Sequence, residues 1–198
     1  FLRVVSEKTK IYSDIIRTAY RRASTMATYP TENNLADQLK IVARLIKGGL
    51  KTRVYTVTIG GFDTHKKQVN ASDTTTGSHA QLMKNISSGI AAFQQDLEAM
   101  DLDDRVLGMT FSEFARRIKS NASLGTDHGT ARPMFIVGKG VKGGLYGRHP
   151  GLTDLDDGNL KMTPDFRRVY ATMIDEWLGC HETPAILKGQ FETFKVFA

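Results

Sequence analysis

The sequence predicts an α/β fold in which a mostly parallel sheet is flanked by helices, as a single domain over residues 1–198. Three observations support this prediction. Segments rich in β-branched residues alternate with amphipathic segments, the order strand, helix, strand occurs twice, and polar clusters lie where the strands end. With 40% hydrophobic and 24% charged residues the chain can bury a core, which excludes a collagen-like or broadly disordered protein.

Three segments predict the strands of this sheet, namely residues 53–59, 105–111 and 133–137. The first is the richest in β-branched residues and stops at Gly60-Gly61. Parallel strands joined by right-handed crossovers bring their carboxyl ends to one edge of the sheet, where functional sites lie. Residues 139–157 are dense in glycine and predict a long loop that covers such a site.

Apolar side chains at three- and four-residue spacing predict four amphipathic helices. The first covers residues 4–27, with Val5 and Ile15 on its apolar stripe, and ends before Pro30. The other three start after Asn33 or Asn34, at Ser78, and after Thr163-Pro164-Asp165, and they end at Gly48-Gly49, near Met100 and at Gly179. We expect two shorter helices, one from Ser112 and one after His181.

Composition excludes several classes of function. The formal net charge of +6 comes from 27 basic and 21 acidic residues, but the basic residues occur as dispersed pairs, so no nucleic-acid partner is expected. No apolar run approaches the roughly 20 residues of a transmembrane segment. The single cysteine, Cys180, excludes an intrachain disulfide and a cysteine-rich zinc site. No Gly-x-x-x-x-Gly-Lys-Ser/Thr loop occurs, so no nucleotide cofactor is expected.

Two Asp/His pairs near the predicted strand ends suggest a metal site. Asp63 and His65 follow the first strand, and Asp127 and His128 precede the third. Carboxylate oxygens and imidazole nitrogens are the ligands that zinc or manganese takes where no thiolate is available. Two such ions about 4 Å apart can stabilise both the attacking and the leaving oxygen in a phosphoryl-type transfer. The four side chains are therefore candidate ligands of a divalent metal.

Each of these residues also has a plainer interpretation. Asp127 is equally a turn residue before Gly129, and His65 can cap the segment that follows it. The candidate catalytic residues are Glu113, which is otherwise a first-turn helix acid, and Arg116, which otherwise lies on a solvated helix face.

Two further histidines are candidate metal ligands. His79 lies beside the predicted helix start at Ser78, where it either faces the first Asp/His pair or sits on the surface. His149 lies in the glycine-rich loop, where it either closes a metal shell or is exposed.

Five motifs in chain order resemble the DUF1501 family. They are Gly60-Gly-Phe-Asp-Thr-His65, Phe111-Ser-Glu-Phe-Ala-Arg-Arg117, Gly125-Thr-Asp-His-Gly129, Val141-Lys-Gly-Gly-Leu-Tyr-Gly147, and Asp165-Phe-Arg-Arg-Val-Tyr-Ala171 with Trp177-Leu-Gly179. The resemblance runs from about Leu39 to Gly179. That family is grouped with the alkaline-phosphatase-like superfamily of phosphatases, sulfatases and cofactor-independent phosphoglycerate mutases, so the resemblance implies an alkaline-phosphatase-like sheet.

The resemblance also implies a ligand set. By similarity, Asp127 and His128 bind one divalent metal, zinc or manganese with calcium as the other candidate, and Asp63 and His65 contribute to a second. His79 or His149 would supply a further ligand. The superfamily places its nucleophile in an N-terminal part that does not match this sequence, which begins at Phe1. We therefore expect a C-terminal part of a longer, exported or periplasmic bacterial protein, inactive without its N-terminal half.

Two functions remain as expectations. The first is a metal-binding domain that, in the intact protein, hydrolyses a phosphate or sulfate ester of an anionic small molecule or polymer. The alternative is a non-catalytic binding domain that recognises an anionic glycan or surface polymer through Arg116, Arg117 and the lysines of the glycine-rich loop.

Overall fold

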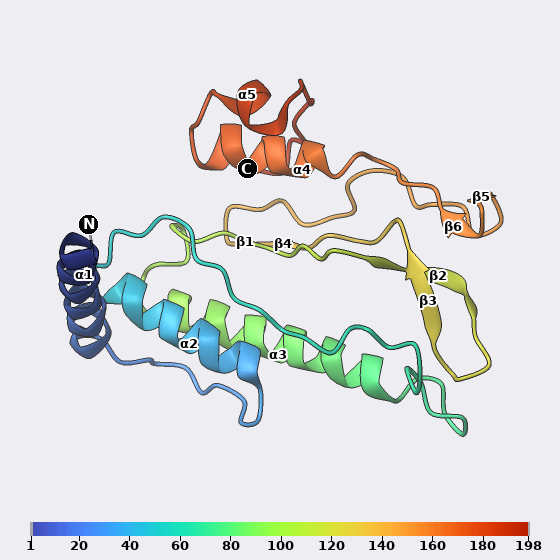
Figure 1. Ribbon diagram of the computed structural model, residues 1–198, viewed down its shortest axis with the longest axis horizontal. Coiled ribbons are helices and arrows are strands. Elements are labelled where there is room, and N and C mark those ends of the chain that lie inside the picture. The colour runs from blue at the N-terminus through green and yellow to red at the C-terminus, as the bar shows by residue number, and fades with distance from the viewer. Residues whose placement is uncertain (1, 198) are drawn as a thin grey trace. The chain divides into compact units, whose positions relative to one another are not determined.

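The computed structural model describes the backbone of residues 2–197 and the side chains of residues 8–197 (Figure 1). The chain forms two compact units, Phe1–Val106 and Leu107–Ala198, called here the N-terminal and the C-terminal unit. The single domain expected over residues 1–198 stays a prediction.

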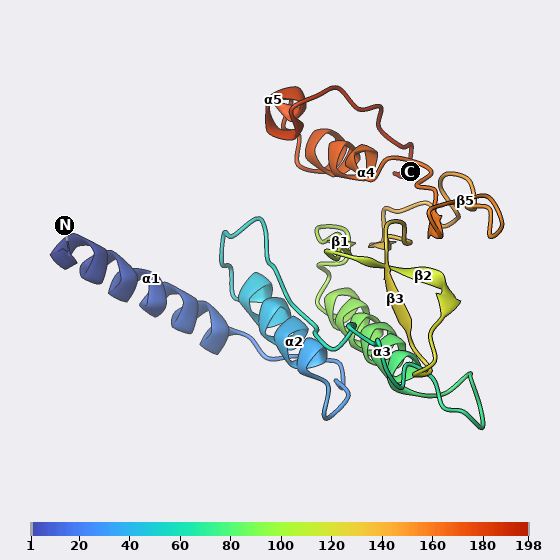
Figure 2. The same cartoon turned by 45° about the vertical axis from the view of Figure 1, so that its right-hand side comes forward.

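Three helices build the N-terminal unit: α1 (Leu2–Arg22), α2 (Asn34–Lys47) and α3 (Ser78–Ala99). They confirm the first three predicted helices, although the side chain of Val5 lies outside the described residues. Helices α2 and α3 run side by side, and α1 contacts α2 (Figure 2). The apolar stripes of α2 and α3 form the core, with Leu35, Leu39, Ala43, Phe93, Leu97, Met100 and Leu102 buried. Periodicity therefore predicts the buried faces of α2 and α3, whereas Ile15 on the apolar stripe of α1 stays 48% exposed.

Two polar side chains satisfy backbone groups at the start of α2 and at the end of α1. At the start of α2, the Asn33 side chain accepts a hydrogen bond from the Ala36 amide at 3.2 Å and donates to the Asn85 carbonyl at 2.7 Å, which also ties α2 to α3. Near the end of α2, Arg44 donates to the carbonyls of Tyr20 and Ala23 at 2.9 and 2.8 Å. Arg44 therefore caps the C-terminal end of α1, where carbonyl groups lack partners within the helix.

Gly48, the C-cap of α2, allows α1 to approach closely. A Cβ atom added there would lie 1.9 Å from the Ala19 carbonyl oxygen. We expect Gly48→Ala to lower the free energy of unfolding by about 1 to 2 kcal/mol, because α1 must shift to relieve the overlap. Urea denaturation followed by circular dichroism measures this loss. Gly60→Ala is the matched control, since a Cβ atom there meets open space; equal destabilisation by both variants would contradict the close approach.

The strand predicted at residues 53–59 is wrong, because this segment pairs with no other described residues in a sheet. Val57 and Ile59 face inward against the helical core. Gln38 takes the place of a neighbouring strand, because its side chain accepts from the Thr58 amide at 3.0 Å and donates to the Thr58 carbonyl at 2.8 Å. The alternating β-branched pattern thus packs on helices here and does not build a sheet.

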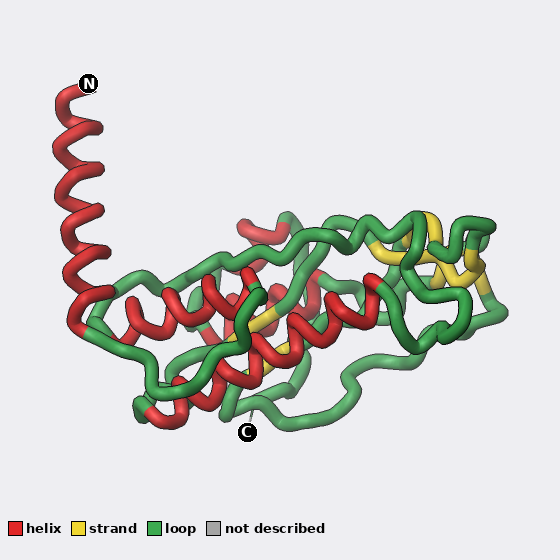
Figure 3. The backbone as a smooth tube through the Cα atoms, turned by 90° about the horizontal axis from the view of Figure 1, so that it is seen from below, coloured by secondary structure: helices red, strands yellow, loops and turns green. Residues whose placement is uncertain are grey.

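Six short strands, three helical segments and long loops make up the C-terminal unit (Figure 3). The strands are β1 (Gly108–Met109), β2 (Ala115–Ser120), β3 (Thr126–Gly129), β4 (Ile136–Val137), β5 (Leu155–Asp156) and β6 (Asn159–Leu160). The helical segments are α4 (Arg167–Thr172), the π-helical turn η1 (Met173–Trp177) and α5 (Thr183–Leu187). They confirm the predicted helix before Gly179 and the short helix after His181. The predicted loop over residues 139–157 is largely irregular, as expected.

The strands overturn the predicted α/β fold with its parallel, alkaline-phosphatase-like sheet. In the described residues they form only three two-stranded antiparallel pairs, β1 with β4, β2 with β3 and β5 with β6. The turn between β2 and β3 shows the physical reason. Asn121 accepts hydrogen bonds from the amides of Ser123 and Gly125 at 2.9 and 3.1 Å, which reverses the chain at once. Such a turn gives antiparallel neighbours, whereas parallel pairs need a crossover of about a dozen residues.

The helix predicted from Ser112 is also wrong. Ser112 and Glu113 lie in an irregular segment, and the residues after them form β2. The Ser112 hydroxyl donates to the Phe114 carbonyl at 2.9 Å, and so it turns the chain into the strand and does not cap a helix. Glu113 is therefore no first-turn helix acid.

The C-terminal tail packs back onto α4 through Thr172. This side chain is fully buried, and its hydroxyl donates to the Arg168 carbonyl at 2.7 Å while it accepts from the Phe194 amide at 2.9 Å. Nearby, the Lys142 amide donates to the Val196 carbonyl at 2.7 Å. The tail thus connects α4 to the glycine-rich loop.

Candidate functional site

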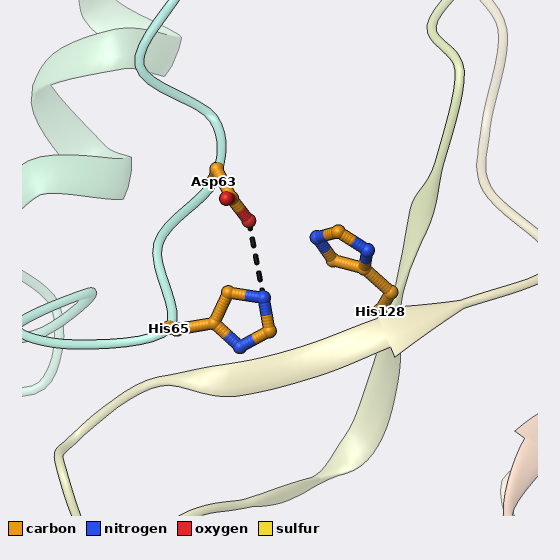
Figure 4. Close-up of side chains that lie close together, drawn as sticks. All are labelled: Asp63, His65 and His128. Atoms are coloured by element: carbon orange, nitrogen blue, oxygen red, sulfur yellow. Dashed lines mark ion pairs between the residues drawn. The ribbon is translucent and has the colours of Figure 1, made fainter.

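The first Asp/His motif lies in the N-terminal unit, in the loop that leads to α3. Asp63 Oδ1 lies 3.1 Å from His65 Nε2, with the two side chains 63% and 41% exposed (Figure 4). Thr64 between them is buried, and its hydroxyl donates to Gln68 Oε1 at 2.9 Å. Because this middle residue is anchored inward, both neighbours project outward on one side of the loop. The motif therefore presents a carboxylate and an imidazole together to solvent.

His79 in the first turn of α3 has different surroundings. Its ring meets Phe62 edge-on, with 6.2 Å between the ring centroids. Its Nδ1 atom is buried without a hydrogen-bond partner among the described residues. The His79 amide donates to the Gln68 carbonyl at 3.1 Å, which closes the loop onto the helix. Of the predicted ligands in this unit, the structure thus pairs Asp63 with His65, whereas His79 packs against an aromatic ring.

The second Asp/His motif lies in the C-terminal unit, on the β2–β3 hairpin. Asp127 and His128 are exposed residues of β3, and His128 pairs in register with Arg116 of β2. The imidazole of His128 stacks on the Phe114 ring, with centroids 4.1 Å apart and planes 15° from parallel. Because consecutive residues of a strand point to opposite faces, Asp127 and His128 lie on different faces of the hairpin. His128 is thus the oriented donor of this motif.

Arg116 supports this stack. Its guanidinium carbon lies 4.9 Å from the centroid of the Phe114 ring, and its Nη1 donates to the Thr126 carbonyl at 2.7 Å. Both contacts hold the hairpin together, so Arg116 helps to position the Phe114 ring on which His128 stacks. Its neighbour Arg117 lies 3.8 Å from the carboxylate of Asp157. The prediction of Arg116 as a catalytic residue stays untested, as does that of Glu113, which is exposed just before β2.

His149 lies in the glycine-rich loop and is exposed, as one of its two interpretations predicted. Its Nδ1 atom lies 2.8 Å from the Pro150 carbonyl oxygen. It lines a cavity of about 320 Å³ together with Arg148 and Lys161. The acidic Asp154 lines the same cavity and pairs with Lys161.

Sequence reasoning missed two residues that matter for these positions. One is Phe114, the stacking partner of His128; an aromatic residue two positions before Arg116 was visible, but its register against His128 was not. The other is Asp96, which is fully buried and accepts from the amides of Met26 and Ala27 at 2.6 and 3.0 Å. An acid on the apolar stripe of a predicted helix was the available signal for it.

Tyr29 completes the environment of Asp96 by donating its hydroxyl to the carboxylate at 2.8 Å. Burial, followed by this hydrogen bond and the negative charge of Asp96, raises the pKa of the Tyr29 phenol well above its usual range. Tyr29 therefore stays neutral and serves as a donor. Asp96 is a structural carboxylate that connects α3 to the segment after α1.

Fold and motifs together define a class of protein: a helical unit and a hairpin-rich unit, each carrying one exposed Asp/His motif of metal-ligand type. The chain belongs to the DUF1501 family, described as protein of unknown function, which matches residues 12–181. This confirms the resemblance seen in the five motifs. The comparison with curated proteins and the comparison with solved structures found no match. Within the described residues, none of the helices has the length and apolar character needed to cross a bilayer.

Proposed function

We propose that this chain binds divalent cations, zinc or manganese, with Asp63 and His65 as ligands in the N-terminal unit and His128 as a ligand in the C-terminal unit. We further propose that in the intact, exported protein this binding serves hydrolysis of an anionic phosphate or sulfate ester. The observation that carries the proposal is the Asp63–His65 pair, a carboxylate and an imidazole 3.1 Å apart and both accessible. Imidazole nitrogens beside a carboxylate oxygen suit zinc or manganese better than calcium, which takes oxygen ligands almost alone.

The orientation of each donor supports this choice. The buried Thr64 holds the first pair outward, and the Phe114 ring restricts the imidazole of His128. A ligand whose rotamer is already restricted loses less entropy on binding a metal. Asp127, on the opposite face of the hairpin, is the alternative donor of the second motif.

The hydrolytic part of the proposal rests on the family. The resemblance seen in the five motifs implies a relation of DUF1501 to the alkaline-phosphatase-like superfamily, and Asp127-His128-Gly129 is similar to an Asp-His-Gly signature. A bound divalent ion would polarise the ester oxygen and stabilise the charge that develops there. Asp63 and His65 would hold an ion in the N-terminal unit and His128 would hold one in the C-terminal unit, where Glu113 is the exposed candidate for moving a proton.

The alternative, recognition of an anionic polymer through Arg116 and Arg117, has less support. Arg116 is engaged with Phe114 and Thr126, and Arg117 lies beside Asp157. Their cationic groups are thus already used within the C-terminal unit.

Titration of the metal-free chain with Zn²⁺ or Mn²⁺ by isothermal calorimetry tests the metal proposal. We expect saturable binding in which Asp63→Ala and His65→Ala weaken the site of the N-terminal unit, and His128→Ala weakens that of the C-terminal unit, each by at least about tenfold. His181→Ala is the matched control, because this exposed histidine belongs to neither motif, and it should bind like the wild type. Asp127→Ala should weaken binding less than His128→Ala. Absence of binding, or equal weakening by His181→Ala, would contradict the proposal.

A further inference from the structure

The C-terminal unit contains a polar cavity that neither Asp/His motif lines. It has a volume of about 320 Å³ and is lined by Arg148, His149, Pro150, Gly151, Asp154, Lys161 and Thr163. Three of these side chains are basic and one is acidic. The Lys161 ammonium contacts the Asp154 carboxylate, so these two charges compensate each other. The charge left over belongs to Arg148.

The Arg148 guanidinium is available for a ligand. Among the described residues it has neither an ion-pair nor a hydrogen-bond partner. Its backbone is held in place, because the Thr163 hydroxyl donates to the Arg148 carbonyl at 3.1 Å. A guanidinium presents parallel N–H donors that match two oxygens of a phosphate group. Arg148 can therefore bind two oxygens of one anion, and its hydrogen bond to Thr163 holds its backbone in place.

His149 adds a hydrogen-bond acceptor. Its Nδ1 atom lies 2.8 Å from the Pro150 carbonyl oxygen, and because a carbonyl only accepts, Nδ1 carries the hydrogen in this contact. In the neutral ring, Nε2 then holds a lone pair that can accept from an O–H group. Beside Arg148 and Lys161, this acceptor suits an anionic ligand that also carries an O–H group.

We infer that Arg148, His149 and Lys161 form a binding pocket for a phosphate group, either inorganic phosphate or the phosphate of a small monoester. The phosphate oxygens would accept from Arg148 and Lys161, and the P–OH of the monoanion would donate to His149 Nε2. A cavity of about 320 Å³ lies at the lower end of the range for small-ligand sites, which fits a compact ligand. This inference is independent of the proposed metal site.

Titration of the full chain with inorganic phosphate, followed by ¹H–¹⁵N NMR in the presence of EDTA, tests this pocket. The chelator removes divalent ions, so any binding observed does not pass through a metal. We expect saturable shifts at residues 148–163 with a dissociation constant of about 1 mM or tighter. Glycerol phosphate should shift the same residues. Asp63→Ala should bind phosphate like the wild type, which separates this test from that of the metal proposal.

Arg148→Gln should weaken phosphate binding at least about tenfold, because the bidentate contact is lost. Lys142→Gln is the matched control: it removes one positive charge from an exposed loop position in the same unit. His149→Phe keeps a planar ring without an acceptor and should reduce the preference for phosphate over sulfate, since sulfate has no O–H to donate at neutral pH. Absence of saturable binding to the wild type, or equal weakening by Lys142→Gln, would overturn the inference.

Discussion

Asp96→Ala should lower the free energy of unfolding by about 3 to 5 kcal/mol, the largest effect on stability that we expect from one substitution in this chain. The carboxylate is fully buried and accepts from the amides of Met26 and Ala27 and from the Tyr29 hydroxyl. Alanine would leave all three donors without this acceptor. Chemical denaturation followed by circular dichroism measures the loss.

Two matched variants test this explanation. Asp96→Asn keeps the side-chain volume and one accepting oxygen for the backbone amides, so it should cost only about 1 to 2 kcal/mol. Tyr29→Phe removes one donor and leaves the two backbone contacts, so about 1 kcal/mol is expected. If Asp96→Asn destabilises as strongly as Asp96→Ala, the buried negative charge matters more than the number of hydrogen bonds. If all three variants are neutral, Asp96 does not hold residues 26–29.

Gly129→Ala should both destabilise the β2–β3 hairpin and weaken metal binding. A Cβ atom at this position would lie 2.6 Å from the carbonyl carbon and oxygen of Arg116 and 2.8 Å from the Arg117 nitrogen. These are backbone atoms of the paired strand, so the overlap can be relieved only by moving the strands apart. We expect a loss of about 2 to 3 kcal/mol in unfolding free energy. Separation of the strands would also disturb the stack of His128 on Phe114.

The two effects can be measured separately. Denaturation gives the loss of stability, and calorimetry with Zn²⁺ under native conditions gives the loss of affinity, expected to be at least about tenfold if His128 is a ligand. Gly143→Ala is the control, because a Cβ atom there meets open space, and it should be neutral in both measurements. Unchanged affinity in a destabilised Gly129→Ala chain would argue against His128 as a ligand.

In each unit, the candidate metal ligands depend on the packing and hydrogen bonds that stabilise that unit. In the N-terminal unit, the Asp/His motif lies in the loop that closes onto α3 through Gln68 and His79. The same helix carries Asp96 toward its other end. In the C-terminal unit, His128 depends on strand pairing and on one aromatic neighbour. Each donor is thus oriented by contacts made some residues away from it.

The helices could be predicted because their signals are local. Asn33 caps α2 as expected, Gly48 ends it, and the spacing of Phe93, Leu97 and Met100 marks the buried face of α3. Within one helix, every residue that defines the pattern lies a few positions from the next. The Asp63–His65 pair was recognisable for the same reason, since the two residues are neighbours in sequence.

The sheet could not be predicted in this way, because strand pairing depends on which segments meet. Residues 53–59 have a strand-like pattern, yet Val57 and Ile59 pack on helices and Gln38 bonds to the Thr58 backbone. Residues 115–120, in contrast, pair with β3 because Asn121 closes a tight turn. Neither partner can be inferred from the composition of the segment itself.

The sequence by itself determined the helices of the N-terminal unit, the Asn33 cap of α2, the residue types that can bind a metal and, through its ordered motifs, membership of the DUF1501 family. Only the tertiary structure decided that the strands are short antiparallel pairs, that Phe114 stacks on His128, that Asp96 is buried against residues 26–29, and that Arg148 and His149 share a cavity with Lys161. The physical reason is the separation along the chain of the residues that interact. Helix geometry joins residues three or four positions apart, whereas strand pairing, ring stacking and buried hydrogen bonds join residues that are distant along the chain.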